Sequence, residues 1–383
     1  MATGEVLIVG GGITGVAAAL ALAERGVGVR LIERDRLAAM GSGWTLGGVR
    51  QSGRDPAELP LARAAVARWA ELDARLGGRP GYRRRGNLRL ARDEAEVETI
   101  RALAATQAAA GLDIALLDGE AARRIAPALS RDILAASFCR DDGHADPIAA
   151  VTALADEAQR LGAQIESGVA ATALTTRGGA VTGVETNAGR READCVVLAC
   201  GLHAPALLAP LGLDLPIAAR IVLVLQTTPA PPLFEQVFGV ANADCAGRQE
   251  IDGRLRVTTG VSDWKGDATG WTADSIQPRA RDVATLIARA GAILPALHEA
   301  RVARVWGGLI DLTPDGLPAL DAPCPGLVVA SGFSGHGFGI GPVSGEIVAD
   351  LVTGAASPFD LAPFRLARFS TARGPAAPLT LHG

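Results

Sequence analysis

The chain has 383 residues, 49% of them hydrophobic, and carries a formal net charge of −4. That length gives room for two or three domains with their own cores, while the acidic balance excludes a nucleic-acid surface, which needs clustered basic side chains. Glycines at positions 10, 11 and 12 interrupt the apolar N-terminal stretch, which therefore predicts neither a secretion signal nor a membrane span. We expect a cytoplasmic protein.

The cysteines and histidines give no sign of a metal site. Five of each are present, without a Cys-x-x-Cys pair and without ligand-like spacing between the two residue types. We therefore expect no metal, and in particular no structural zinc and no iron–sulfur cluster.

The first apolar run, residues 6–9, ends in a glycine-rich turn that opens onto an alanine-rich stretch. This pattern predicts a buried strand, a tight turn and a helix. Gly10, Gly12 and Gly15 have the spacing G-x-G-x-x-G, in which the first glycine allows the turn, the second lets a pyrophosphate approach and the third packs the helix on the strand. The free amides at the start of such a helix face the phosphates.

The residues after this turn strengthen the interpretation. Gly26 ends the helix, residues 29–32 predict a second strand, and Glu33 stands at the end of that strand. An acid about 20 residues beyond the turn is placed to accept hydrogen bonds from a ribose hydroxyl. The alternative for a lone glycine motif is a plain structural turn. With this context, the sequence predicts dinucleotide binding.

Further helices follow from capping residues and apolar spacing. Asp93 with Glu96 forms a capping box, Asp118 caps a short helix, and Asp146 with Pro147 marks an N-cap and first turn. Residues 41–50 are too rich in glycine for a regular element, and a long loop beside a nucleotide fold is usually functional. The expected helices run through residues 61–72, 97–107, 118–127, 147–161, 278–294 and 342–351.

The strands expected beyond residue 80 fall into two groups. The apolar run 195–199 ends in a small residue and a glycine, as in a second strand of the nucleotide sheet. The run 217–226 and an Asp-Gly hairpin at 250–255 belong to a second, mostly antiparallel domain. The other strands expected are 86–91, 163–166, a meander around 177–179, and 327–330.

The C-terminal quarter repeats the opening arrangement. An apolar strand, 327–330, leads into a glycine-rich loop, 331–341, and then into a helix over 342–351. Such a unit aims backbone amides and a positive helix end at a negative or polar group. The alternative is a glycine loop without a ligand.

Four motifs together resemble the FAD-dependent amine and amino-acid oxidoreductases, the family of D-amino-acid oxidase, glycine oxidase and sarcosine oxidase. They are the glycine turn with Glu33, residues 199–201, residues 306–318 and residues 332–338. The resemblance covers nearly the whole chain in order. It is closest to the branch of the sarcosine oxidase β-subunit, dimethylglycine dehydrogenase, and opine or hydroxyproline dehydrogenase.

The resemblance implies an α/β fold, α+β overall. One part is a discontinuous, Rossmann-like FAD-binding domain of the glutathione-reductase type, and the other is a mostly antiparallel substrate-binding domain. The expected FAD-binding segments are 1–79, 145–215 and 316–370, the substrate-binding segments are 80–144 and 216–315, and a tail covers 371–383.

The resemblance also implies FAD rather than NAD as the cofactor. Because residues 306–315 lack the cysteine that carries covalent flavin in monomeric sarcosine oxidase, we expect noncovalent FAD. Its adenosine would lie on Glu33, its adenine against the main chain of Val169, and its ring between residues 41–48 and 335–341. The cofactor-binding residues expected are Gly10, Gly12, Ile13, Thr14, Gly15, Glu33, Arg34, Ser42, Gly47, Gly48, Val169, Cys200, Gly201, Gly335, His336, Gly337, Phe338, Gly339 and Ile340.

The catalytic residues implied by the resemblance are Arg50 and His336. Arg50 aligns with the arginine that binds the substrate carboxylate in sarcosine oxidases, and a guanidinium matches a carboxylate in a bidentate fork. The alternative is a surface arginine. His336 would contact the flavin or the substrate, the alternative being a loop histidine bonded to backbone, and His203 is a weaker candidate.

Two positions depart from well-known members of the family. Ile310 stands where glycine oxidase and D-amino-acid dehydrogenases carry a carboxylate-binding arginine, and Gly339 stands where monomeric sarcosine oxidase has a lysine. A simple α-amino-acid oxidase is therefore disfavoured. Lys265, the sole lysine, follows the strand that carries the oxygen-activating lysine of sarcosine oxidase, but we expect it to be exposed.

The preferred function is dehydrogenation of a secondary amine or an amino or imino acid, such as hydroxyproline, proline, an opine or a sarcosine-like compound, by hydride transfer to flavin N5. One alternative is a D-amino-acid or glycine oxidase that uses oxygen. Another is a non-catalytic flavin-binding subunit of a complex. The electron acceptor would be a quinone, a partner subunit in a hetero-oligomer, or oxygen, and any membrane association would be peripheral, through that acceptor.

Overall fold

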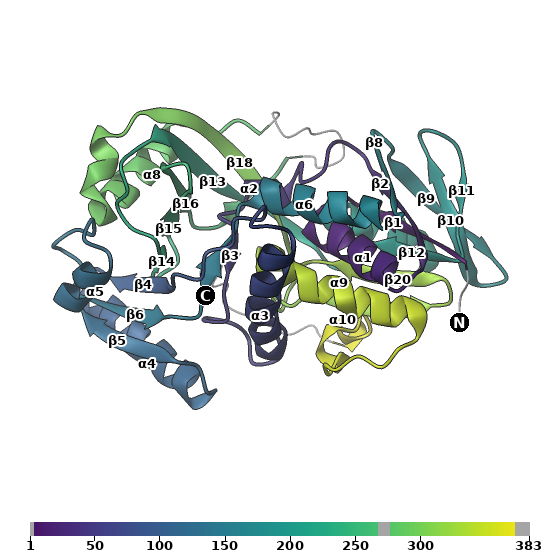
Figure 1. Cartoon of the computed structure of the whole chain (residues 1–383), viewed down its shortest axis with the longest axis horizontal. Coiled ribbons are helices and arrows are strands. Elements are labelled where there is room, and N and C mark those ends of the chain that lie inside the picture. The colour runs from purple at the N-terminus through teal and green to yellow at the C-terminus, as the bar shows by residue number, and fades with distance from the viewer. Residues whose placement is uncertain (1–3, 267–275, 372–383) are drawn as a thin grey trace.

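A computed structural model of the chain describes residues 4–266 and 276–371. Two large sheets occupy opposite ends of the long axis, with helices α1 (Ile13–Glu24), α6 (Pro147–Arg160) and α9 (Gly337–Thr353) side by side at one end (Figure 1). The expected α/β fold class is thereby confirmed. No helix within the described part of the chain is long and apolar enough to cross a membrane.

The first sheet is parallel except at one edge. The opening strand lies at its centre and pairs in parallel with β2 on one side and β12 on the other, as the apolar run 195–199 predicted. The edge strand β19 runs antiparallel to β20. In spatial order the strands are β19 (Ala319–Cys324), β20 (Leu327–Ser331), β12 (Cys195–Leu198), β1 (Glu5–Val9), β2 (Gly28–Glu33) and β8 (Gln164–Ser167).

Both faces of this sheet are covered, which explains why its strands are apolar throughout. Val6 and Ile8 face a core shared with α1, α6, α9 and α3 (Leu59–Arg75), whereas Leu7 and Val9 face the opposite core. A small antiparallel sheet covers that second face; its strands are β9 (Ala171–Arg177), β10 (Ala180–Thr186) and β11 (Arg191–Glu192). Three layers result, and α1 lies inside them almost completely buried.

The second sheet is antiparallel except where β14 and β4 run in parallel. Its apolar face packs against α8 (Ala280–Ile293) and α5 (Gly119–Ile125). The Asp-Gly hairpin predicted at 250–255 joins two of its strands. The strands are β17 (Ser262–Asp263), β13 (Ala218–Pro229), β16 (Arg254–Thr259), β15 (Cys245–Gln249), β14 (Val237–Val240), β4 (Asn87–Ala91), β6 (Ala135–Cys139) and β5 (Ile114–Asp118), with β18 (Val302–Leu312) also on β13.

Every strand of the parallel sheet falls within the segments expected to bind FAD, and every strand of the second sheet falls within 80–144 or 216–315. Among the described residues, one sheet contains strands from both the FAD-binding and the substrate-binding segments. It has two strands, β3 (Gly48–Val49) and β7 (Gly143–His144). The domain boundaries themselves stay a prediction.

Two expectations about glycine-rich segments were wrong. Residues 41–50 are not irregular throughout, because they contain the helical turn α2 (Gly41–Trp44) and then β3. A Cβ at position 43 would lie 2.1 Å from the Ala38 carbonyl oxygen, so glycine permits this tight turn. The C-terminal helix begins at Gly337 rather than at Pro342, which lies inside it.

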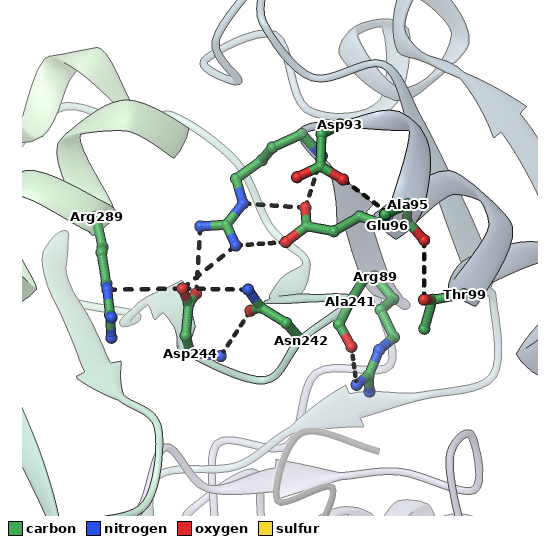
Figure 2. A network of polar contacts seen from close by, with 10 residues as sticks. Arg89, Asp93, Ala95, Glu96, Thr99, Ala241, Asn242, Asp244 and Arg289 are labelled. Carbon is green, nitrogen blue, oxygen red and sulfur yellow. Dashed lines mark hydrogen bonds and ion pairs between the residues drawn. The ribbon is translucent and has the colours of Figure 1, made fainter.

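An ion-pair network fastens α4 (Glu94–Ala109) to the turn between β14 and β15 and to α8. Asp244 lies 3.2 Å from Arg92 and 3.6 Å from Arg289, and Arg92 also pairs with Glu96 at 2.5 Å. Figure 2 shows Asp244 between Arg289 and the start of α4, where the Asp93 carboxylate caps the helix by accepting from the Glu96 amide at 2.9 Å.

Replacing this shared carboxylate should destabilise the protein. We expect Asp244→Ala to lower the free energy of unfolding by about 1 kcal/mol, because two partly buried arginines lose a partner. Urea unfolding followed by circular dichroism measures this change. The matched control is Arg101→Ala, which removes an exposed i,i+3 pair with Glu98 and should leave the midpoint unchanged. Equal effects of the two substitutions would mean that the network adds nothing.

Candidate active site

A cavity of about 620 Å³ lies between the two sheets, at the carboxyl ends of the parallel strands. Ligands of open α/β sheets bind at this edge. One end of the cavity is lined by the glycine turn and by Glu33, and the other by mostly apolar residues of the second sheet, with Asn87 and Thr258 among them. Those apolar residues are Val222 and Val224 of β13, Val237 and Phe238 of β14, and Leu309 of β18.

The three glycines of the turn have different surroundings. Gly10 has a φ of +115°, and a Cβ there would lie 2.4 Å from the Ala199 carbonyl oxygen. A Cβ on Gly15 would lie 2.0 Å from the Gly10 oxygen. At Gly12 the only atom within 4 Å of a built Cβ is Ser42 Oγ, at 3.1 Å. Position 12 is therefore open toward the cavity, as a cradle for a pyrophosphate requires.

Polar contacts hold the turn in place. Glu33 accepts from the amides of Gly11 at 2.7 Å and Asp35 at 2.8 Å. Ser42 Oγ accepts from the Ile13 amide at 2.9 Å, which connects α2 to the start of α1. Glu33 thus shapes the turn and also faces the cavity, where its remaining lone pairs can accept from a ribose.

Most of the residues expected to bind the cofactor do line the cavity. They are Gly10, Gly12, Ile13, Thr14, Glu33, Arg34, Ser42, Gly48, Val169, Cys200, Gly201, Gly335, His336, Gly337 and Phe338.

Four of the expected residues lie behind the cavity wall instead. Gly15 packs α1 on β1, and Gly47 has a φ of +70° and leaves no room for a side chain, since a Cβ there would lie 2.3 Å from the Ala145 oxygen. Gly339 accepts from Trp69 Nε1 at 2.7 Å through its carbonyl, and Ile340 is buried in the core under α9. The early start of α9 explains the last two, because it turns residues 339 and 340 toward the neighbouring elements.

Arg50 is not a surface arginine, because it is 9% exposed and lines the cavity. Burial and the nearby Arg54 lower its pKa to about 9, which leaves it charged at neutral pH. The chain after it is anchored on Asp142, whose carboxylate accepts from the Gln51 amide at 2.8 Å and from the hydroxyl and amide of Ser52. Burial raises the pKa of Asp142.

His336 also lines the cavity, and its ring faces Glu58 rather than backbone. Nδ1 lies 3.4 Å from Glu58 Oε2, and Arg54 Nε lies 3.8 Å from the other oxygen of this buried carboxylate. Burial, with the charge of Arg54, lowers the pKa of His336 and keeps the ring neutral at neutral pH. Although burial opposes it, the contact with His336 and the charge of Arg54 lower the pKa of Glu58.

Asp311 was missed as a site residue. Its carboxylate accepts from the amides of Gly332 at 2.9 Å and Phe333 at 3.1 Å, so the end of β18 holds the glycine loop against the cavity. Burial raises its pKa to about 6. The residue falls within the motif at 306–318, but motif matching alone did not indicate this contact.

Of the other residues considered from the sequence, two line the cavity and one lies outside it. His203 lines the cavity, and burial together with Arg34 lowers its pKa to about 4. Ile310 lines the cavity too, and presents an apolar side chain. Lys265 is exposed and outside the cavity, as expected. Across residues 4–266 and 276–371, no cluster of three or more His, Cys, Asp or Glu side chains is arranged to hold a metal.

The open glycine at position 12, the acid on β2 and the apolar far compartment fit a dinucleotide whose second half is a flat, largely apolar ring. The site therefore belongs to a dinucleotide-dependent oxidoreductase. The profile of the DAO family, described as FAD dependent oxidoreductase, matches residues 5–351, and the chain belongs to this family. The expected resemblance, the FAD cofactor and the enzyme class are confirmed.

Individual relatives agree with this assignment. The bifunctional protein ThiO/ThiG of Synechocystis sp. is 31% identical over 365 residues, which cover 91% of this chain and 52% of that protein. The chain thus spans about half the length of that relative. Glycine oxidase of Bacillus licheniformis is 26% identical, with 91% of this chain and 93% of that protein covered.

The fold is shared with solved structures. L-proline dehydrogenase from P. horikoshii superposes with a TM-score of 0.86 at 27% identity and covers 96% of this chain and 97% of its own. Glycine oxidase from Geobacillus kaustophilus gives a TM-score of 0.87 at 27% identity, covering 95% of this chain and 98% of its own.

Proposed function

We propose that this enzyme dehydrogenates a secondary amine, or an amino or imino acid, that carries a carboxylate. Bound FAD supplies the hydride acceptor, its N5 atom. The chain has to orient the carbon next to nitrogen toward that acceptor and to exclude water. The observation that carries the proposal is Arg50, a buried and charged guanidinium in the wall of a cavity whose far end is apolar.

The chain's own residues have separable roles in this proposal. Arg50 binds the substrate carboxylate through its fork of N–H donors. Valines on β13 and β14 form a dry wall around the reacting carbon. His336, held neutral beside Glu58, adds no positive charge that would repel a substrate ammonium group.

Proline, hydroxyproline, opines and sarcosine-like compounds are the substrates we favour, and the likeness to L-proline dehydrogenase supports cyclic imino acids among them. The second candidate is oxidation of glycine or a D-amino acid with oxygen, which the likeness to glycine oxidases supports. A non-catalytic flavin subunit is the third. Rates of reoxidation by a quinone, by a partner subunit and by oxygen identify the electron acceptor.

Anaerobic bleaching of the yellow holoenzyme tests the proposal. We expect at least one secondary amine or imino acid with a carboxylate to reduce the flavin within the time of turnover, and the matching carboxamide to reduce it much more slowly. If neither the favoured compounds nor glycine nor D-amino acids bleach the flavin, the result supports the non-catalytic alternative. Reoxidation in air-saturated buffer as fast as turnover would identify an oxidase.

We predict that the FAD is noncovalent. The residues at 306–315 include no cysteine, and Cys200, which lines the cavity, is a poor nucleophile because burial raises the pKa of its thiol to about 12. Acid precipitation should therefore release all the yellow colour to the supernatant. Colour that stays with the pelleted protein would contradict the prediction.

A further inference from the structure

Arg54 is a second buried cation on the wall of the same cavity. Its side chain is 2% exposed and lines the cavity beside Arg50. Its Nε donates to the Arg50 carbonyl at 3.2 Å and lies 3.8 Å from Glu58 Oε1. Its Nη1 is buried and has no hydrogen-bond partner among the described residues. A buried guanidinium nitrogen without an acceptor is costly, so a ligand atom at this position would be stabilising.

The nearby carboxylates do not supply that acceptor. Glu58 Oε1 lies 3.8 Å from Arg54 Nε, beyond hydrogen-bond distance, and has no hydrogen-bond partner of its own among the described residues, while Oε2 lies 3.4 Å from His336 Nδ1. Asp142 is occupied by the Gln51 amide and the Ser52 hydroxyl. Arg54 is also the strongest of the charges that act on Arg50, so the two guanidinium groups repel each other in a poorly solvated space. A single substrate carboxylate on Arg50 leaves Nη1 of Arg54 without an acceptor.

We propose that Arg54 binds a second anionic group of the substrate, and that amino or imino dicarboxylates are therefore preferred over monocarboxylates such as proline and sarcosine. This inference rests on the proposed function, in which Arg50 binds the first carboxylate. Because Arg54 approaches Arg50 through its Nε, its Nη1 is left without an acceptor, which the second acid group would supply. The planar fork of a guanidinium suits a carboxylate at this place better than an ammonium would.

Matched substrates that differ by one carboxylate test this proposal on the holoenzyme. The pairs are sarcosine with iminodiacetate, and norvaline with glutamate in both configurations. We expect the wild-type enzyme to prefer a diacid over its monoacid by about 30-fold or more in kcat/KM, the effect of a partner at a buried charge. In Arg54→Met the preference should disappear because KM rises far more for the diacid than for the monoacid.

Conservative and control variants distinguish the loss of the Arg54 charge from a general disturbance of the fold. Arg54→Lys should recover part of the diacid preference, and Arg54→Gln serves if the methionine variant does not fold. Arg101→Met, on the exposed face of α4, should behave as wild type. A second readout needs no turnover: succinate should perturb the flavin absorbance of the holoenzyme at lower concentration than butyrate, and this difference should vanish in Arg54→Met.

The outcomes distinguish failure of the inference from failure of the proposed function. The inference is overturned if monoacids reduce the flavin without a preference for any diacid, or if Arg54→Met weakens both members of each pair equally. Loss of FAD from Arg54→Met also overturns it, because Arg54 would then hold the cofactor. The proposed function fails if neither monoacids nor diacids bleach the flavin.

Discussion

Purified Gly12→Val should be a colourless protein with less than about a tenth of the wild-type FAD content. The Cβ of residue 12 would enter the open space of the cavity, where only Ser42 Oγ lies within 4 Å. The chain itself can accommodate the side chain there, but a pyrophosphate cannot approach the backbone past a branched side chain. The absorbance ratio at flavin and protein wavelengths measures occupancy, and circular dichroism checks that the apoprotein is folded.

Two other glycines make this experiment specific. Gly28→Val places the same side chain at the exposed start of β2, where nothing lies within 4 Å of a Cβ, and should keep full occupancy. Gly15→Ala should instead destabilise the fold, because its Cβ would lie 2.0 Å from the Gly10 oxygen. Full flavin content in Gly12→Val would show that the pyrophosphate lies elsewhere.

Local patterns were enough to predict the parallel sheet and the glycine turn. The strand over residues 6–9, its turn and Glu33 are neighbours in sequence, so their spacing alone carries the geometry. Buried parallel strands such as 195–199 are apolar on both faces, which makes them visible without knowledge of their partners. Asp93, Asp118 and Asp146 each cap the helix that they were expected to cap.

Residues whose position depends on contacts between distant segments could not be predicted in this way. Asp311 reaches the loop at 332–333 only because β18 and β20 end at the same edge of the cavity. Arg54 is close to Arg50 in sequence, but its orientation depends on Glu58 and on His336, which is far away along the chain. The local sequence around either residue gives no signal of such long-range contacts.

A high glycine content did not by itself indicate which glycines contact the cofactor. Glycines at 43, 339 and 341 allow close packing inside or beside helices, where a Cβ would meet Ala38, Gly48 or Ile13. The same residue type at position 12 leaves space for a ligand. Composition does not separate these two uses, which is why Gly339 was expected in contact with the cofactor although it lies behind the wall.

Arg50→Met should lower kcat/KM for a carboxylate substrate by about 30-fold to several thousand-fold. The substitution leaves the substrate carboxylate facing an apolar side chain in a buried place, and removing one partner of such a pair costs about 2–5 kcal/mol. Because the carboxylate keeps its charge throughout the reaction, most of the loss should appear in KM. Arg50→Lys should recover only part, since an ammonium does not reproduce the bidentate fork.

The decisive comparison pairs a carboxylate substrate with its carboxamide in each variant. If Arg50 recognises the negative charge, Arg50→Met loses activity on the acid but changes little on the amide, and the two substrates become nearly equivalent. Flavin content should stay at the wild-type level, which separates a role toward the substrate from one toward FAD. Equal losses on acid and amide would mean that Arg50 shapes the cavity without reading the carboxylate, and the assignment of an acidic substrate would lose its main support.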